Sequence, residues 1–153
     1  MHRTPARLYR VLAIAEAITW TILIGALIAR AVGAPSIVVT IGGGIHGLIF
    51  LAYGATAILV AFNQRWSIGL GILAVASAIV PYATIPMEIW LHRTSRLTGQ
   101  WRLDETDHPQ DRTWYDRTMR WFLRRAWVLV TLIVVAVVAL YVVLLLVGPP
   151  GGK

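Results

Sequence analysis

The sequence predicts an all-α fold, an integral membrane helical bundle with four transmembrane helices and one interfacial amphipathic helix. Of its 153 residues, 58% are hydrophobic and only 14% are charged, whereas ordinary soluble proteins carry roughly 25% charged residues. The hydrophobic residues form four continuous runs, each near or above the roughly 20 residues that a helix needs to cross the hydrocarbon core. A membrane β-barrel would instead show short segments in which apolar and polar residues alternate.

Three of the runs predict a three-helix membrane domain over residues 1–96. These runs cover residues 8–30, 36–62 and 66–91. The segments between them are only a few residues long, and connections this short join antiparallel neighbours. We therefore expect the three helices to pack side by side.

The third run is the least regular of the four. Pro81 and Pro86 each lack a backbone donor and disfavour the helical turn before them, so we expect a break near Val80. If the run nevertheless crosses the membrane, Glu88 comes close to the membrane face that carries the turn with Arg30, where it can form an interfacial salt bridge with Arg30 or Arg93.

Residues 97–125 are predicted to form a polar loop followed by an amphipathic helix in the headgroup region. From about residue 111, apolar residues recur at helical spacing, with arginines on another side of the helix. Arginines and tryptophans directly before a spanning helix fit anionic lipid headgroups better than nucleic acid. The fourth run then forms the last transmembrane helix and a short tail, residues 126–153. The predicted interfacial anchors are Arg117, Arg120, Arg124, Trp114 and Trp121.

The distribution of Lys and Arg gives conflicting evidence on orientation. If all four runs cross the membrane, a cytoplasmic N-terminus places five of the 14 basic residues inside and nine outside, and the opposite orientation reverses this ratio. The positive-inside rule counts these residues and favours a cytoplasmic loop over residues 92–125 of a multi-pass protein in the bacterial plasma membrane. Arg3, Arg7 and Arg10, which precede the first helix, argue the other way.

The second run contains a concentration of glycine, in the stretch VVTIGGGIHGLIFL of residues 38–51. Gly43 and Gly47 form a G-x-x-x-G pattern, and Gly42 and Gly44 widen the flat surface. Small residues let neighbouring helices approach closely in a membrane, where lipid provides no hydrophobic drive for association. These four glycines are therefore predicted to form a helix-packing face.

Glu16 and His46 are the ionisable residues well inside the runs, and such residues usually face the bundle interior and find partners. Counted from the turn between the first two runs, they differ in height by about 6 Å, so a hydrogen bond or an ion pair between them is feasible. One interpretation is structural: they bond to each other, or to Thr19, Thr40 and backbone carbonyls, and fix the register of two helices. The alternative is a site that handles protons or binds a ligand.

Several kinds of site are not expected. The chain has no cysteine, which excludes disulfides, zinc–thiolate sites and iron–sulfur clusters. No second intramembrane histidine accompanies His46 for bis-histidine haem ligation, and the acidic segment 104–108 lacks a metal-ligand spacing. The sequence also shows no nucleophile–base–orienter arrangement, phosphate-binding loop or dinucleotide fingerprint. We expect no cofactor, no metal, no catalytic residue and no nucleic-acid partner.

Five blocks of sequence carry a family resemblance. The blocks are Tyr9-Arg10, Glu16-Ala17-Ile18-Thr19-Trp20, Gly43 with His46-Gly47-Leu48-Ile49-Phe50 and Tyr53, Arg65-Trp66, and Pro81-Tyr82-Ala83-Thr84. Over about residues 8–96 the chain resembles the YdzA-like family of small bacterial integral membrane proteins, a domain of unknown function. The resemblance implies a three-helix membrane domain with no assigned activity. Residues 97–153 are an addition to that pattern.

We expect a non-catalytic integral membrane protein, an accessory subunit or assembly factor of a larger membrane protein complex. Its helix faces and the added segment 97–153 would dock partner subunits. The second hypothesis is a small oligomeric channel or proton-coupled carrier that uses the intramembrane pair Glu16 and His46, and a membrane enzyme is the third. The expected partners are the lipid bilayer, anionic lipid headgroups and other membrane protein subunits.

Overall fold

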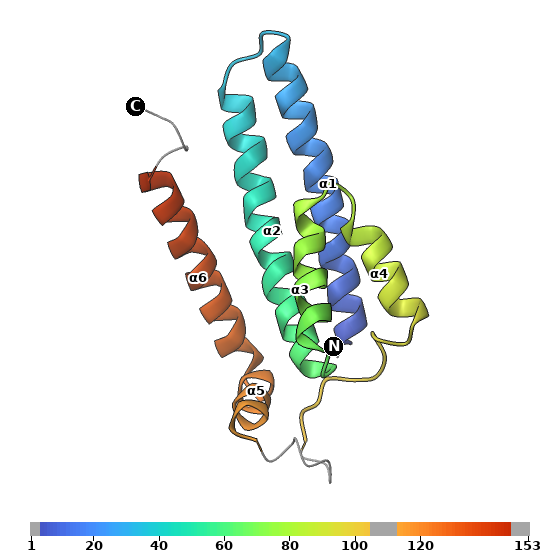
Figure 1. Ribbon diagram of the computed structural model, residues 1–153. Coiled ribbons are helices and arrows are strands. Elements are labelled where there is room, and N and C mark those ends of the chain that lie inside the picture. The colour runs from blue at the N-terminus through green and yellow to red at the C-terminus, as the bar shows by residue number, and fades with distance from the viewer. Residues whose placement is uncertain (1–3, 105–112, 148–153) are drawn as a thin grey trace. The chain divides into compact units, whose positions relative to one another are not determined.

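The computed structural model describes residues 4–104 and 113–147, and the secondary structure in these two ranges is entirely helical (Figure 1). The prediction of an all-α fold is therefore confirmed for the described residues. The chain divides into two compact units, Met1–Gln100 and Trp101–Lys153. The helices are α1 (Pro5–Ala31), α2 (Ile37–Asn63), α3 (Ile68–Ala76), the 3-10 helix η1 (Ser77–Ile79), α4 (Thr84–Arg93), α5 (Trp114–Arg124) and α6 (Ala126–Val147).

The first unit is built on the antiparallel hairpin of α1 and α2 (Figure 1). α1 begins at Thr4, whose Oγ1 accepts a hydrogen bond from the backbone N–H of Arg7 at 3.2 Å, and Pro5 occupies the first turn, where a missing N–H costs nothing. Past the end of α1, Gly33 adopts a φ of 103°, which the turn into α2 requires. Each helix has 27 residues, or about 40 Å. Among the described residues, these two helices are long and apolar enough to cross a membrane.

The predicted third span over residues 66–91 is not a single helix. The run forms α3 with η1, then a turn, then α4, so the predicted break near Val80 is confirmed. Val80 has an extended backbone, as the residue before a proline prefers, and Tyr82 has a φ of 64° that reverses the chain. The 12 residues from Ile68 to Ile79 measure about 18–20 Å, well short of the roughly 30 Å hydrocarbon core.

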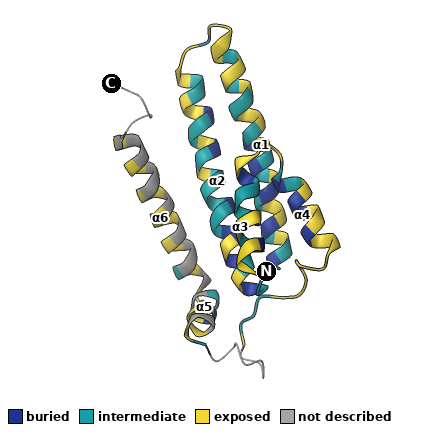
Figure 2. Cartoon of the chain, viewed as in Figure 1, coloured by how far each residue is buried: buried dark blue, intermediate teal, exposed yellow. Residues whose placement is uncertain are grey.

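The segment α3–η1–α4 covers only part of the α1–α2 hairpin, the half that contains Pro5 and Asn63 (Figure 1). The half nearest the Gly33 turn has no such cover within this unit, and Figure 2 shows it mostly exposed or intermediate. Ile28 and Ile41 there are 60% and 57% exposed. Side chains that are fully buried in the covered half include Tyr9, Ala13, Tyr53, Val60, Ala74 and Leu91.

The second unit contains α5 and α6, with only Arg125 between them. Arg124 at the end of α5 holds the preceding loop, because its guanidinium donates to Leu103 O at 2.8 Å and lies 3.0 Å from the carboxylate of Asp104. α6 has 22 residues and no charged residue. Side chains such as Leu132 and Val138 are about half exposed, as expected of a helix that meets lipid or another protein.

Candidate functional site

Polar side chains of the first unit gather in two buried clusters between α1, α2 and the segment α3–η1–α4. The inner polar cluster consists of Glu16, Thr19, His46 and Thr84. The tyrosine cluster consists of Tyr9, Tyr53 and Ser77. The sequence predicts the two ionisable residues of the inner cluster and none of the residues in the tyrosine cluster.

In the inner polar cluster, His46 bonds to Thr19 instead of Glu16. Its Nδ1 lies 3.1 Å from Thr19 Oγ1, and the Thr19 hydroxyl donates its hydrogen to the backbone oxygen of Glu16 at 2.9 Å. Because a hydroxyl has a single hydrogen, Thr19 accepts from His46, which places a hydrogen on Nδ1. The imidazole also stacks obliquely against Trp20, with ring centroids 4.4 Å apart, and it is 8% exposed.

The carboxyl group of Glu16 is completely buried and turns toward α4. Thr84 Oγ1 donates to Glu16 Oε2 at 3.1 Å and lies equally close to the backbone oxygen of Ala13. The other carboxyl oxygen, Oε1, has no hydrogen-bond partner among the residues that the structure describes, which is unusual for a buried polar atom. The structure therefore brings Glu16 and His46 to neighbouring positions of one cluster but forms no hydrogen bond or ion pair between these two described residues.

Thr40, the other hydroxyl considered as a partner, lies outside the cluster. Its Oγ1 bonds to the backbone oxygen of Ser36, one turn earlier in α2. Of the structural alternatives for His46, the bond to Thr19 is the one that the structure contains.

The tyrosine cluster lies two helical turns from the inner cluster. The hydroxyls of Tyr9 and Tyr53 are 2.6 Å apart, and Tyr53 also bonds to Ala74 O and Ser77 Oγ, both at 3.0 Å. Both tyrosines are uncharged at neutral pH, so the charged residues of the sequence do not point to them. The available signal is their spacing, because Tyr9 precedes Glu16 by seven residues and Tyr53 follows His46 by seven, which puts each tyrosine on the same helix face as its ionisable neighbour.

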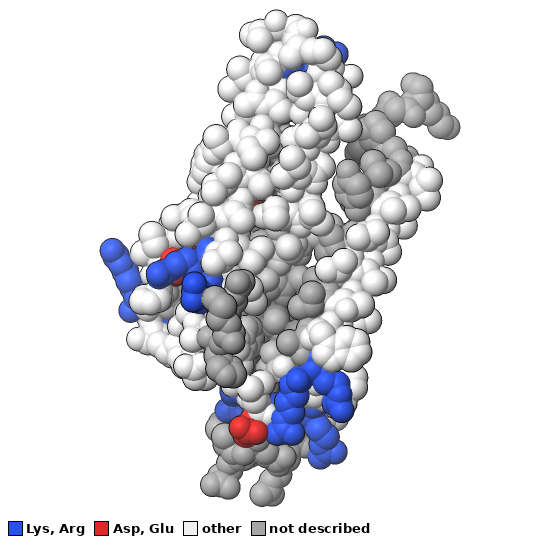
Figure 3. Space-filling view, turned by 180° about the vertical axis from the view of Figure 1, so that it is seen from behind, with Lys and Arg blue, Asp and Glu red and all other residues white. Residues whose placement is uncertain are grey.

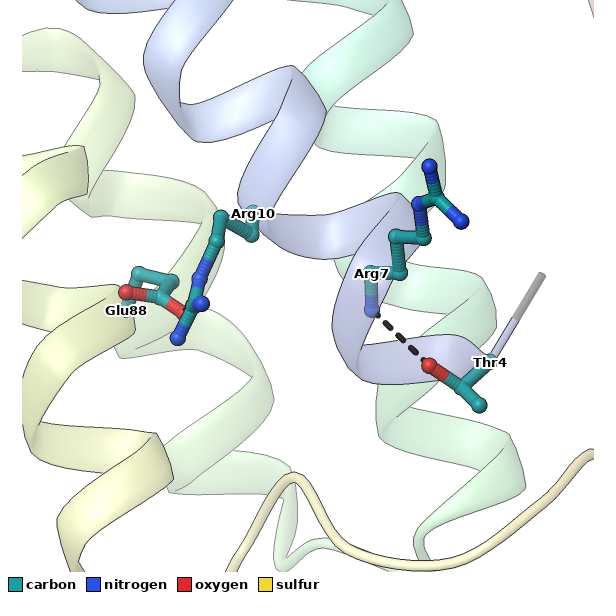
Figure 4. A network of polar contacts seen from close by, with 4 residues as sticks. All are labelled: Thr4, Arg7, Arg10 and Glu88. Atoms are coloured by element: carbon teal, nitrogen blue, oxygen red, sulfur yellow. Dashed lines mark hydrogen bonds and ion pairs between the residues drawn. The ribbon is translucent and has the colours of Figure 1, made fainter.

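Glu88 pairs with Arg10, not with Arg30 or Arg93. Figure 4 shows Arg10 of α1 extending toward Glu88 of α4, and the Nε–Oε1 distance is 2.8 Å. The Glu88 side chain is 7% exposed, whereas that of Arg10 is 52% exposed. After the turn at Tyr82 the chain reverses direction, so α4 carries Glu88 back toward the start of α1. A third helix that crossed the membrane would instead place Glu88 near the Gly33 turn.

Three of the four predicted packing glycines differ in how close a neighbouring helix lies. A Cβ atom added to Gly42 would lie 3.1 Å from Ala26 Cβ, so α1 and α2 lie close together there. A Cβ on Gly43 would meet only Leu23, at 3.9 Å, and one on Gly47 would meet nothing within 4 Å. Gly44 is half-buried. Within this unit, the G-x-x-x-G pair Gly43 and Gly47 therefore leaves an open surface at its second glycine.

The predicted interfacial anchors of α5 differ in exposure. Trp114 and Trp121 are 78% and 45% exposed, and Arg117 and Arg124 are exposed as well. Arg120 is 8% exposed, unlike the other four predicted anchors. Arg125, which follows α5, lies over the Trp121 ring at 4.7 Å. Most of the acidic segment 104–108 lies outside the described residues.

A family model covers most of the first unit. The model for a domain of unknown function, DUF3817, matches residues 6–93. The chain belongs to the DUF3817 family. The matched range of this chain contains both clusters and the whole segment α3–η1–α4, whereas α5 and α6 lie beyond it. The resemblance to a family of unknown function is thereby confirmed, and the name YdzA-like stays a prediction.

A curated relative supports a membrane location for the DUF3817 domain. A protein of Streptomyces coelicolor described as a "putative membrane protein" is 36% identical over 93 residues. The aligned part is 60% of this chain but only 11% of the relative. No solved structure matches the chain. The relative's description and the two long apolar helices together indicate a membrane protein of unknown function.

Proposed function

We propose that this chain is a non-catalytic accessory subunit or assembly factor of a larger membrane protein complex in the bacterial plasma membrane. It would be a multi-pass protein in which α1 and α2 cross the bilayer and α6 provides a further crossing. The observation that carries the proposal is the contrast between the two halves of the α1–α2 hairpin. The half with the polar side chains is covered by the segment α3–η1–α4, and the half nearest the Gly33 turn is open.

The contacts of the covered half support a structural role for its polar residues. His46 is hydrogen-bonded to Thr19, and Glu16 is hydrogen-bonded to Thr84. In the tyrosine cluster, Tyr53 bonds to three groups at once. Such contacts fix the register of helices in a membrane, and they leave these groups engaged within the domain.

The surface of α2 that begins beside His46 and continues toward the Gly33 turn supports docking of a partner helix. Gly47 has nothing within 4 Å of a Cβ position, and Ile45 and Leu48 beside it are 44% and 49% exposed. A helix surface of small residues lets another membrane helix approach closely. In the Streptomyces relative, the matched segment is a small part of a much longer protein, so a segment similar to part of this chain occurs there together with additional polypeptide.

The second unit would fasten the chain to the membrane surface. Trp114 and Trp121 are exposed aromatic side chains and Arg117 and Arg124 are exposed cations on the helix that leads into α6. Tryptophan at the interface and arginine near anionic headgroups both stabilise such a helix.

The test of the subunit role compares two glycine substitutions in the full chain. Gly47→Leu fills the open surface of α2, and Gly54→Leu is the matched control on the same helix in the covered half, where a Cβ atom also meets nothing within 4 Å. Each variant is purified in a mild detergent, and the accompanying proteins are identified by mass spectrometry. We expect the natural chain and Gly54→Leu to carry the same fixed set of membrane proteins, and Gly47→Leu to lose it. An assembly whose native mass contains copies of this chain alone would contradict the proposal.

One observation favours a second candidate, a channel or proton-coupled carrier. Among the described residues, Glu16 Oε1 is buried without a hydrogen-bond partner, and buried ionisable groups in membranes often mark ion or proton pathways. In proteoliposomes, Glu16→Gln should then abolish a proton flux that the natural chain supports. Glu88→Gln is the control, because it changes the other buried carboxylate without contacting the inner polar cluster. Equal flux in Glu16→Gln and the natural chain would exclude the carrier.

A further inference from the structure

We propose that α3, η1 and α4 form a re-entrant hairpin that enters and leaves the bilayer on one side, so that the arginines there form a single basic surface that binds anionic lipid headgroups of the cytoplasmic leaflet. The proposal rests on where the two ends of the hairpin lie, how deep its tip reaches and how charge is distributed over the first unit.

The two ends of the hairpin lie together at the end of the unit that contains Pro5. Trp66, just before α3, donates its indole N–H to the backbone oxygen of Arg96, just after α4, at 2.9 Å. Gln64 likewise donates to Thr98 O at 2.8 Å. The Trp66 ring also packs edge-on against Tyr9 near the start of α1. The chain therefore returns, after α4, to the side from which α3 departs.

The tip of the hairpin stops partway along α1. Trp20 donates to Ala78 O at 3.2 Å, and the hydroxyls of Thr21 and Tyr82 are 3.3 Å apart. Ala31 ends α1 ten residues beyond Thr21, which corresponds to about 15 Å of helix. The tip therefore lies inside the span of α1 and leaves a large part of the hydrocarbon core uncrossed.

Polar contacts make such a partial insertion stable. Lipid offers no hydrogen bonds to irregular backbone, so a chain reversal at membrane depth is tolerated where it packs against protein. Before the turn, Trp20 donates a hydrogen bond to the backbone oxygen of Ala78. At the start of α4, Thr84 contacts Glu16 and the backbone oxygen of Ala13. One turn later in α4, Glu88 forms an ion pair with Arg10. These contacts attach the hairpin to α1 at three successive levels.

The hairpin changes the charge distribution across the membrane. In the described part of the first unit, Arg30 is the basic residue at the Gly33 end, whereas the hairpin end carries Arg7, Arg10, Arg65, Arg93 and Arg96. Figure 3 shows a few basic side chains at the top of the unit and a group of basic side chains with an acidic one farther down on the left, with largely uncharged surface between them. By the positive-inside rule, the hairpin end is cytoplasmic. Arginines at the base of apolar helices fit the anionic headgroups of that leaflet.

Single cysteines test the hairpin directly, because the chain contains none. The substitutions are Ser36→Cys at the Gly33 end, Ser67→Cys before α3 and Thr98→Cys after α4, all at exposed positions. Spheroplasts and inverted vesicles are treated with a membrane-impermeant maleimide, and labelling in detergent confirms that each thiol can react. We expect Ser67→Cys and Thr98→Cys to label only in inverted vesicles and Ser36→Cys only in spheroplasts. Labelling of Thr98→Cys together with Ser36→Cys would show a full crossing, and labelling of Ser67→Cys and Thr98→Cys from outside would refute the cytoplasmic surface.

The lipid partner is tested by thermal unfolding in nanodiscs. Replacing a phosphatidylcholine bilayer by one that contains phosphatidylglycerol should raise the melting temperature of the natural chain. The variant with Arg93→Gln and Arg96→Gln should lose most of this rise, and Arg30→Gln, the control at the opposite end, should keep it. An equal rise in all three proteins would refute lipid binding by this surface. A rise that appears only on adding RNA or an acidic protein would refute the choice of lipid.

Discussion

Thr84→Val removes one hydroxyl group and tests the contact that joins α4 to α1. Valine keeps the branched shape and nearly the volume of threonine, so the packing changes little. Thr84 Oγ1 lies 3.1 Å from both Glu16 Oε2 and Ala13 O. Among the described residues Glu16 Oε1 has no hydrogen-bond partner, so the substitution removes the bond from Thr84 and leaves near the carboxyl group only the Trp20 indole, which donates to Ala78 O.

Two magnitudes bear on the expected cost. A hydrogen bond between membrane helices contributes about 0.6 kcal/mol on average and up to about 1.7 kcal/mol, because displaced groups usually find other partners. A buried polar group left without a partner costs about 1–3 kcal/mol. The Trp20 indole N–H, the other donor near the Glu16 carboxyl, donates to Ala78 O, so we expect Thr84→Val to lower the free energy of unfolding by about 1.5–2 kcal/mol. With Glu16→Leu already present, the same substitution loses only the bond to Ala13 O and should cost about 0.5–1 kcal/mol.

The assay is a double-mutant cycle of four proteins in detergent micelles, unfolded with sodium dodecyl sulfate and followed by circular dichroism. A coupling of about 1 kcal/mol between Thr84→Val and Glu16→Leu would support the contact. Effects that add within about 0.3 kcal/mol would mean that the two side chains do not interact. That result would refute the docking of α4 on Glu16.

Two further predictions use the same unfolding assay. Gly42→Ala should destabilise the chain by about 1–3 kcal/mol, because the added Cβ would lie 3.1 Å from Ala26 Cβ. At Gly47 an added Cβ meets nothing within 4 Å, so Gly47→Ala should stabilise α2 by about 0.5–1 kcal/mol. If Gly47→Ala were the more destabilising of the two, the helices would approach each other elsewhere. Tyr53→Phe should lower the free energy of unfolding by about 1–3 kcal/mol, because it removes the hydrogen bond to the buried Tyr9 hydroxyl. Tyr9→Phe should lower it by less, about 0.5–1.5 kcal/mol, because Tyr53 keeps its bonds to Ala74 O and Ser77 Oγ. Equal losses of stability in the two variants would count against this bond pattern.

The sequence is informative about helices and less so about side-chain partners. The long runs that become α1 and α2 leave few alternatives to helices, because every backbone polar group in lipid must be satisfied within the segment. Periodicity and depth also point to Glu16 and His46 as interior residues. They do not specify which group each one reaches. Thr84 is 68 residues from Glu16 in sequence, and its approach depends on a turn whose geometry hydropathy does not encode.

The third run shows why hydropathy misjudges a partial insertion. Both a spanning helix and a re-entrant hairpin are surrounded by lipid, so both require a long apolar segment. The differences are local: Pro81 ends the first arm, and Tyr82 takes a left-handed backbone conformation that reverses the chain. A second signal lies in the charges. With four crossings, no orientation puts both the N-terminal arginines and those after Arg93 on the cytoplasmic side. With a hairpin that returns to its side of entry, both groups lie on one side, and the positive-inside rule is satisfied without conflict.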